Sequence, residues 1–161
     1  MKKVILIMIG IAVNVAALAN SVVDAAVEFI AREESFSATP YTCPGGKVTI
    51  GYGCTDKEVV AKGKITKAEA EVILRKRVEK EIKWVKEKLP KLTDCQLVAV
   101  TSLVFNIGRT RFLRSKAYQY LQTGYLLRAV IEMQEFRMSQ GKVSKGLVAR
   151  RQRERDLFLG C

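Results

Sequence analysis

Glu34 and Thr49 are two polar side chains in one short stretch that could take part in the same hydrolytic reaction. A general acid needs a carboxyl group whose pKa is raised by burial, and Glu34 lies between the apolar residues Ile30 and Phe36. The Thr49 hydroxyl could hold a water molecule. The plainer alternatives are a surface glutamate at a helix end and a β-branched residue that favours a strand.

The elements that must position these side chains are a helix and a hairpin. Between residues 20 and 34, apolar residues recur every three or four positions with charged residues between them, which predicts an amphipathic helix. Thr39–Tyr41 and Lys47–Ile50 are predicted to be strands, joined by a turn at Cys43–Gly46. Helix, turn and strand can then direct side chains toward one point.

The rest of the chain is predicted to be helical scaffold. Residues 66–69 form a capping box at the start of a long, charged helix that Pro90 stops. The apolar face of that helix is expected to consist of Leu74, Val78, Ile82, Val85 and Leu89. Thr93 or Asp94 caps a more apolar helix over residues 97–107. Further elements are expected at residues 116–122 and 126–138 as helices, 141–146 as a loop and 147–159 as a final, arginine-rich helix.

The chain carries a strong positive charge and has no histidine. Its 28 Lys and Arg against 16 Asp and Glu give a net charge of +12, which favours nucleic acid, anionic lipid or acidic cell-wall polymer as partners. The lack of histidine excludes Ser-His-Asp and Cys-His nucleophilic sites and removes the commonest zinc ligand. The cysteines lack the paired short spacings of a zinc site, so no metal is expected; they are Cys43, Cys54, Cys95 and Cys161.

Residues 1–19 have the layout of an export signal. Lys2 and Lys3 precede an apolar run, and Ala17–Ala19 would serve as a cleavage site. As a helix, residues 4–19 would span roughly 24 Å, against about 30 Å for the hydrocarbon core of a bilayer. The segment is therefore expected to be a marginal membrane anchor that is either cut off or inserted and later released. A buried helix of a cytoplasmic protein is the alternative.

The stretch around Glu34 resembles the phage-type lysozymes of glycoside hydrolase family 24. Their motif has a Glu, an Asp nine residues later and a Thr six residues beyond it, and Glu34, Thr49 and the Ile-Gly-Tyr-Gly run at residues 50–53 fit this frame. The central and C-terminal blocks of the family are similar to residues 92–96, 103–108 and 141–154. The resemblance covers roughly residues 22–160.

The resemblance implies an α+β, predominantly helical fold with two lobes and a cleft beside a small β-sheet. The catalytic domain, residues 20–161, would consist of a β lobe at about 35–63, a connecting helix at about 66–89 and a helical lobe at about 92–160. The resemblance also implies hydrolysis of the β-1,4 bond between N-acetylmuramic acid and N-acetylglucosamine in peptidoglycan, with Glu34 as general acid. A monomer without cofactors is expected.

Two cysteines depart from the family pattern. Cys43 stands where the family usually has its Asp, and Cys54 stands where a His often follows Gly-Tyr-Gly. A Cys43 thiolate could stabilise the transition state or help water attack, if its pKa fell below the value of about 8.5 for a free thiol. The alternative is a Cys43–Cys54 disulfide, with catalysis resting on Glu34 and Thr49. A site that uses Glu34 alone would correspond to a lytic transglycosylase.

The N-terminal segment resembles that of signal-anchor-release endolysins of phages. This implies an enzyme tethered to the inner membrane and later active in the periplasm on the host cell wall, with peptidoglycan and membrane as partners and no nucleic acid. The alternative from another class is a basic protein that disrupts membranes or binds nucleic acid. Its contact residues would be Arg150, Arg151, Arg153 and Arg155, which in the enzyme are expected on the lobe surface.

Overall fold

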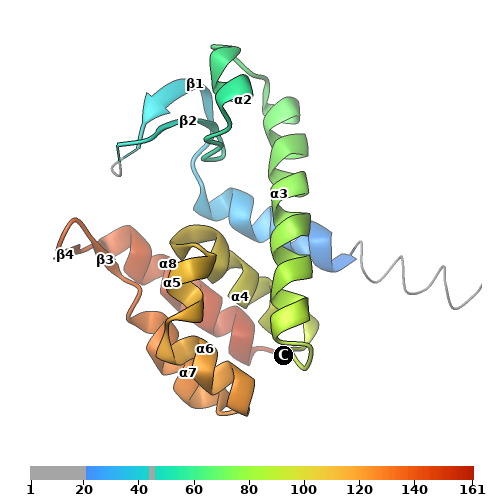
Figure 1. Ribbon diagram of the computed structural model, residues 1–161, viewed down its shortest axis with the longest axis vertical. Coiled ribbons are helices and arrows are strands. Elements are labelled where there is room, and N and C mark those ends of the chain that lie inside the picture. The colour runs from blue at the N-terminus through green and yellow to red at the C-terminus, as the bar shows by residue number, and fades with distance from the viewer. Residues whose placement is uncertain (1–20, 44–45) are drawn as a thin grey trace, which may run out of the picture.

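The computed structural model describes residues 21–43 and 46–161, and it has two lobes joined by a long helix (Figure 1). The smaller lobe contains the strands β1 (Ser37–Thr42) and β2 (Val48–Gly51) and the short helix α2 (Lys57–Ala61). The larger lobe contains α4 (Asp94–Ile107), α5 (Arg109–Leu113), α6 (Lys116–Thr123), α7 (Leu126–Gln134), β3 (Met138–Ser139), β4 (Lys142–Val143) and α8 (Lys145–Leu159). The expected α+β, predominantly helical fold is confirmed.

Residues 21–33 are helical and lead directly into the smaller lobe. The predicted export segment at residues 1–19 lies outside the described residues. Within residues 21–43 and 46–161, no helix is both long enough and apolar enough to cross a bilayer.

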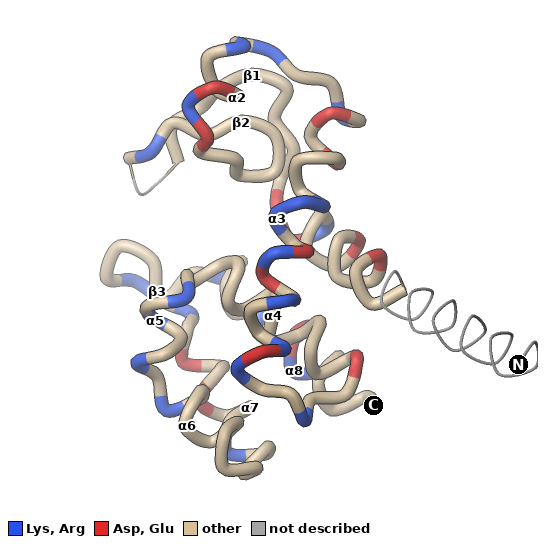
Figure 2. The backbone as a smooth tube through the Cα atoms, turned by 45° about the vertical axis from the view of Figure 1, so that its right-hand side comes forward, with Lys and Arg blue, Asp and Glu red and all other residues tan. Residues whose placement is uncertain are grey.

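The helix α3 (Lys67–Lys88) joins the lobes and buries one apolar face. The Glu69 N–H donates to the Thr66 hydroxyl at 3.2 Å, and the Thr66 N–H donates to the Glu69 carboxylate at 2.7 Å, so the predicted capping box is confirmed. The predicted apolar face is also buried. Basic and acidic residues are interspersed along the remainder of α3, and basic residues also occur on both lobes (Figure 2).

The helix α4 is the centre of the larger lobe. Its residues 97–104 are buried on every side, because α3, α5 and α8 pack against different faces of it. Thr93 caps its start with a second capping box. Gly108 ends it with a φ of 83°, a left-handed conformation that glycine adopts without strain.

The strands β1 and β2 form an antiparallel hairpin in which Tyr41 lies opposite Thr49 and Ser37 lies opposite Gly51. The register is irregular between these two pairs, where Pro40 lacks the N–H that a regular ladder needs. The Cys43 N–H donates to the Lys47 carbonyl at 2.9 Å, which closes the turn. The predicted strands are therefore confirmed, with bounds that differ by one or two residues.

The structure also contains short elements that the sequence pattern does not predict, namely α2, α5 and the hairpin of β3 and β4. The predicted helix over residues 126–138 is wrong at its end, because α7 stops at Gln134 and Met138 already belongs to β3. In the turn between β3 and β4, Gln140 and Gly141 have φ values of 50° and 75°, as tight two-residue hairpin turns require.

A disulfide joins Cys95, at the start of α4, to Cys161, beyond the end of α8. Cys43 and Cys54 are both free, so the alternative that paired them is wrong. The bond closes 66 residues of sequence and holds the end of α8 against the start of α4. Because α8 also contributes to the candidate active site, the disulfide helps to fix a helix on which that site depends.

Candidate active site

Glu34 lies just past the end of the helix over residues 21–33, where the chain turns toward β1. Its N–H donates to the Ile30 carbonyl at 2.9 Å, which continues the helical pattern by one residue. Its side chain is 24% exposed and accepts a hydrogen bond from Arg150 Nη1 at 2.7 Å. Since Arg150 belongs to α8, the last helix reaches back to orient this carboxylate.

Arg150 is itself held by a buried polar network. Its Nε donates to Glu154 Oε1 at 3.2 Å, and its Nη2 donates to the Ser102 carbonyl at 3.2 Å. The same Glu154 oxygen accepts hydrogen bonds from Ser102 Oγ at 2.7 Å and from Arg151 Nη2 at 2.8 Å. Burial raises the pKa of Glu154, and the guanidinium groups of Arg151 and Arg150 oppose that shift. The network holds Nε and Nη2 of Arg150, and Nη1 is left to donate to Glu34.

The expectation that the arginines of the final helix lie on the lobe surface is wrong for two of them. Arg150 and Arg151 are 4% and 1% exposed, because they neutralise the buried Glu154 carboxylate. Arg153 forms a two-pronged ion pair with Glu33, with distances of 2.6 and 2.7 Å, and its hydrogen bond lowers the pKa of Glu33. Of the four arginines predicted as a basic contact surface, only Arg153 and Arg155 therefore have exposed side chains, and both are paired with acidic residues.

A tight glycine turn lies beside Glu34. Ile50 and Cys54 exchange two backbone hydrogen bonds of 2.9 Å, and Gly51 and Gly53 between them have φ values of 66° and 70°. A Cβ on Gly51 would lie 3.0 Å from a methyl group of Ile65, so the turn packs too closely for a larger residue there. A Cβ on Gly53 would lie 3.8 Å from Glu34 Oε2. The second carboxylate oxygen of Glu34 thus faces this turn.

Thr49 and Cys43 lie on the hairpin of β1 and β2. Thr49 is 4% exposed, and its hydroxyl donates to the Tyr41 carbonyl at 3.3 Å, which leaves the oxygen free to accept a further hydrogen bond. Cys43 is a half-buried free thiol just beyond β1. In the described part of the chain, no hydrogen bond or ion pair joins Glu34, Cys43 and Thr49 to one another.

Sequence reasoning missed the role of Arg150 as the partner of Glu34. The only sequence signal is its place in the C-terminal block that resembles phage-type lysozymes, together with Glu154 four residues later on the same helix.

No group of three His, Cys, Asp or Glu residues within the described ranges could hold a metal ion.

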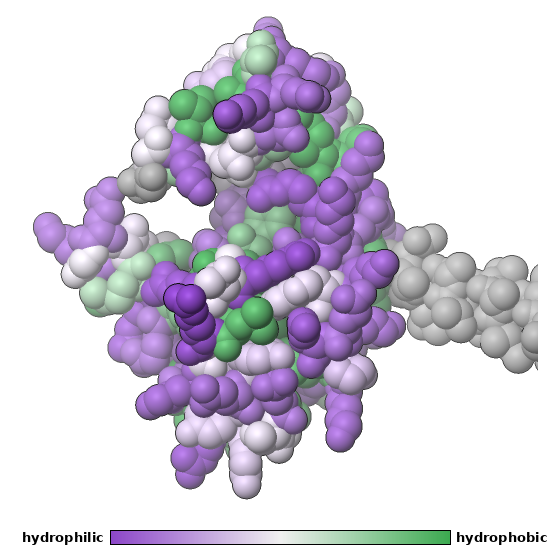
Figure 3. Space-filling model, viewed as in Figure 1, coloured by the Kyte–Doolittle hydropathy of each residue, from purple (hydrophilic) through white to green (hydrophobic). Residues whose placement is uncertain are grey.

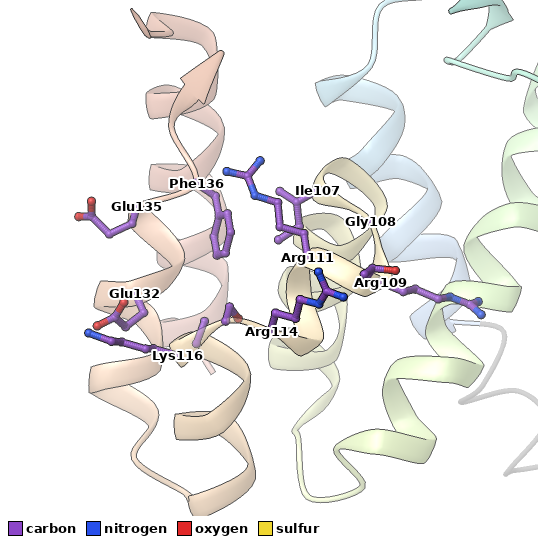
Figure 4. Close-up of a pocket in the computed structure, with 12 residues that line it drawn as sticks. Ile107, Gly108, Arg109, Arg111, Arg114, Lys116, Glu132, Glu135 and Phe136 are labelled. Atoms are coloured by element: carbon purple, nitrogen blue, oxygen red, sulfur yellow. The ribbon is translucent and has the colours of Figure 1, made fainter. Parts of the chain in front are cut away.

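The surface is hollowed between the two lobes, on the side toward which the hairpins β1–β2 and β3–β4 point (Figures 1 and 3). On the larger lobe, a cavity of about 620 Å³ lies between α5, the start of α6 and the end of α7. Arg111, Arg114 and Lys116 line it together with the carboxylates of Glu132 and Glu135 (Figure 4). The Arg111 guanidinium lies 5.1 Å from the centre of the Phe136 ring. The cavity is thus mainly basic, with an acidic wall.

Residues 31–154 match the phage lysozyme family. The chain is 35% identical to an endolysin of Acyrthosiphon pisum secondary endosymbiont phage 1, over 80% of this chain and 91% of the relative. It is 31% identical to a SAR-endolysin of Bacteriophage PS119, over 74% of this chain and 72% of the relative. Against two Bacillus phage endolysins the match spans only 43% of their length.

The fold is also similar to that of solved structures. The muramidase domain of SpmX from Asticaccaulis excentricus superposes with a TM-score of 0.75 and 29% identity, over 84% of this chain and 95% of that domain. The family match covers most of the chain, and the fold agrees with that of a solved muramidase domain. The chain therefore belongs to the phage lysozyme family.

Proposed function

We propose that this protein is an endolysin that hydrolyses the β-1,4 bond between N-acetylmuramic acid and N-acetylglucosamine in peptidoglycan. The observation that carries the proposal is the Glu34 carboxylate, held between the two lobes by Arg150, with its second oxygen beside the Gly53 turn. Membership of the phage lysozyme family and the likeness to endolysins and to a muramidase domain support the same reaction.

In the proposed mechanism, Glu34 is the general acid. It donates a proton to the glycosidic oxygen as the bond from that oxygen to the muramic acid anomeric carbon breaks, which gives an oxocarbenium-like transition state. A water molecule then supplies a hydroxyl group to the anomeric carbon and releases its other proton to solvent, from which the Glu34 carboxylate is protonated again. The hydrogen bond from Arg150 Nη1 to Oε1 fixes the carboxyl group, so that Oε2 is the oxygen that meets the substrate.

Cys43 and Thr49 are proposed to act on the other side of the reacting bond. A Cys43 thiolate would place a negative charge near the developing oxocarbenium ion or would assist the attack of water, as a carboxylate does in related glycosidases. The free, half-buried state of Cys43 is compatible with this role. The Thr49 hydroxyl, with its hydrogen already donated to the Tyr41 carbonyl, would accept a hydrogen bond from the attacking water.

The hollow between the lobes is proposed to take the glycan strand. The basic cavity of Arg111, Arg114 and Lys116 would then attract the carboxylate groups of the wall polymer, because a cation lowers the energy of an anion in a partly desolvated pocket. The net charge of +12 would further favour association with an anionic wall.

The protein is also proposed to be exported, tethered to the inner membrane through residues 1–19 and released to act in the periplasm. The basic start and the marginal apolar length of that segment support this, as does the likeness to SAR-endolysins. Cell fractionation should find the full-length chain in both membrane and periplasmic fractions. A single species that begins at Asn20 would instead indicate ordinary signal cleavage.

A lytic transglycosylase, which needs only the Glu34 acid, is the alternative reaction. In that reaction a hydroxyl group of the muramic acid itself attacks, and the product is an anhydro sugar. Mass spectrometry of glycan fragments released from purified cell walls should show reducing N-acetylmuramic acid ends, because water is the proposed acceptor. Fragments that carry only anhydro-muramyl ends would rule out hydrolysis.

A further inference from the structure

Arg77 is a half-buried arginine on α3 that faces the glycine turn beside Glu34. Its Nη1 donates to the Gly53 carbonyl at 3.0 Å and to the Tyr52 carbonyl at 3.3 Å. These are the two carbonyl groups at the tip of the turn between Ile50 and Cys54. One guanidinium nitrogen therefore holds the turn at Gly53, the residue where an added Cβ would lie 3.8 Å from Glu34 Oε2.

The same guanidinium group also contacts the larger lobe. Its central carbon lies 4.4 Å from the centre of the Phe105 ring, which belongs to α4. A flat cation over an aromatic face is attracted by the ring quadrupole. Arg77 thus connects three parts of the molecule through one side chain: the turn of the smaller lobe, the helix between the lobes and the central helix of the larger lobe.

Arg77 adds to the contacts that hold this turn, in which the Tyr52 side chain is buried and its ring centre lies 5.6 Å from that of Phe36. Gly51 and Gly53 have no side chains, and glycine gives the backbone more freedom than any other residue. A small displacement of the turn would change the space next to Glu34 Oε2, and misplacement of a reacting group by about 1 Å can lower a rate by roughly 100-fold.

We propose that Arg77 is a positioning residue for the glycosidase reaction: it fixes the Tyr52–Gly53 turn beside Glu34 and couples that turn to α4. The proposal rests on the proposed function, since it assigns Glu34 as the acid. Lysine cannot replace this arginine fully, because an ammonium group lacks the planar face that stacks on Phe105 while its nitrogens donate to the carbonyls.

The test compares Arg77→Lys and Arg77→Leu with the wild type, using soluble, peptide-free glycan strands of peptidoglycan as substrate. We expect kcat to fall by about 10- to 100-fold in Arg77→Leu and by less in Arg77→Lys, with KM nearly unchanged. Arg75→Leu is the matched control, because Arg75 lies on the same helix, is partly exposed and pairs with Asp24 rather than with the backbone of the turn. Its kcat should equal that of the wild type.

A merely structural role would give a different pattern. If both Arg77 variants kept the wild-type kcat and lost only thermal stability, the positioning role would be wrong. A rise in KM with kcat unchanged would also overturn it, because that pattern indicates lost substrate binding. Wild type and Glu34→Gln are measured in parallel: an inactive wild type, or an active Glu34→Gln, would refute the proposed function rather than the role of Arg77.

Discussion

Replacement of Glu34 by glutamine is expected to lower the rate of cell-wall hydrolysis by about 10²- to 10⁴-fold, the usual contribution of a general acid. Glutamine has nearly the same shape and can still accept the hydrogen bond from Arg150, but it has no proton of suitable acidity to donate. The fold should persist, because Glu154 remains as the buried counter-ion of Arg150. Loss of turbidity of a cell-wall suspension gives the rate, and thermal unfolding checks the fold.

Glu33→Gln is the matched control for this experiment. Glu33 is the neighbouring glutamate. It accepts two hydrogen bonds from Arg153, which lies on the same helix as Arg150. The control loses a charge and an ion pair one residue away from the site, so activity close to that of the wild type is expected. Equal losses in both variants would mean that the effect is electrostatic or structural, and lysis by Glu34→Gln at the wild-type rate would point to membrane disruption.

Replacement of Glu154 by glutamine should destabilise the protein by about 3–5 kcal/mol, the typical cost of removing one partner from a buried ion pair. Glu154 Oε1 accepts hydrogen bonds from Arg150, Arg151 and Ser102, and no part of its side chain is exposed. Without this carboxylate, the buried Arg151 has no other acid within ion-pair distance among residues 21–43 and 46–161. Urea unfolding at neutral pH measures the loss in the free energy of unfolding.

Asp156→Asn is the corresponding surface control. Asp156 pairs with Arg155, both side chains are well exposed, and such pairs contribute about 0–1 kcal/mol. A Glu154→Gln variant no less stable than this control would show that the buried arginines do not depend on the carboxylate.

The local elements could be predicted from the sequence because their causes are local. The capping box at Thr66 and Glu69 needs only residues three apart, and the buried face of α3 follows from helical spacing. The hairpin of β1 and β2 has β-branched residues on either side of a turn rich in proline and glycine. Hydrophobic periodicity alone does not predict that Glu34 and Thr49 belong to one site. That prediction comes from the spacing of the family motif around them.

The partner of Glu34 could not be predicted in this way. An arginine in a helix dense in charge is usually solvated, and the burial of Arg150 depends on Ser102 and Glu34, which lie 48 and 116 residues away in the sequence. The contact of Arg77 with Phe105 depends equally on how α3 crosses α4. The short hairpin of β3 and β4 has two residues in each strand, too few for a detectable alternation.

The most direct test of the proposed site is the rate of wall hydrolysis by Cys43→Ser and Cys43→Asp, measured side by side with the wild type. If Cys43 supplies the negative charge opposite Glu34, serine should lower the rate by about 100-fold or more, because its hydroxyl is not ionised at neutral pH. Aspartate should keep the protein active, since it restores a carboxylate at that position. A serine variant as active as the wild type would contradict the proposed role of Cys43.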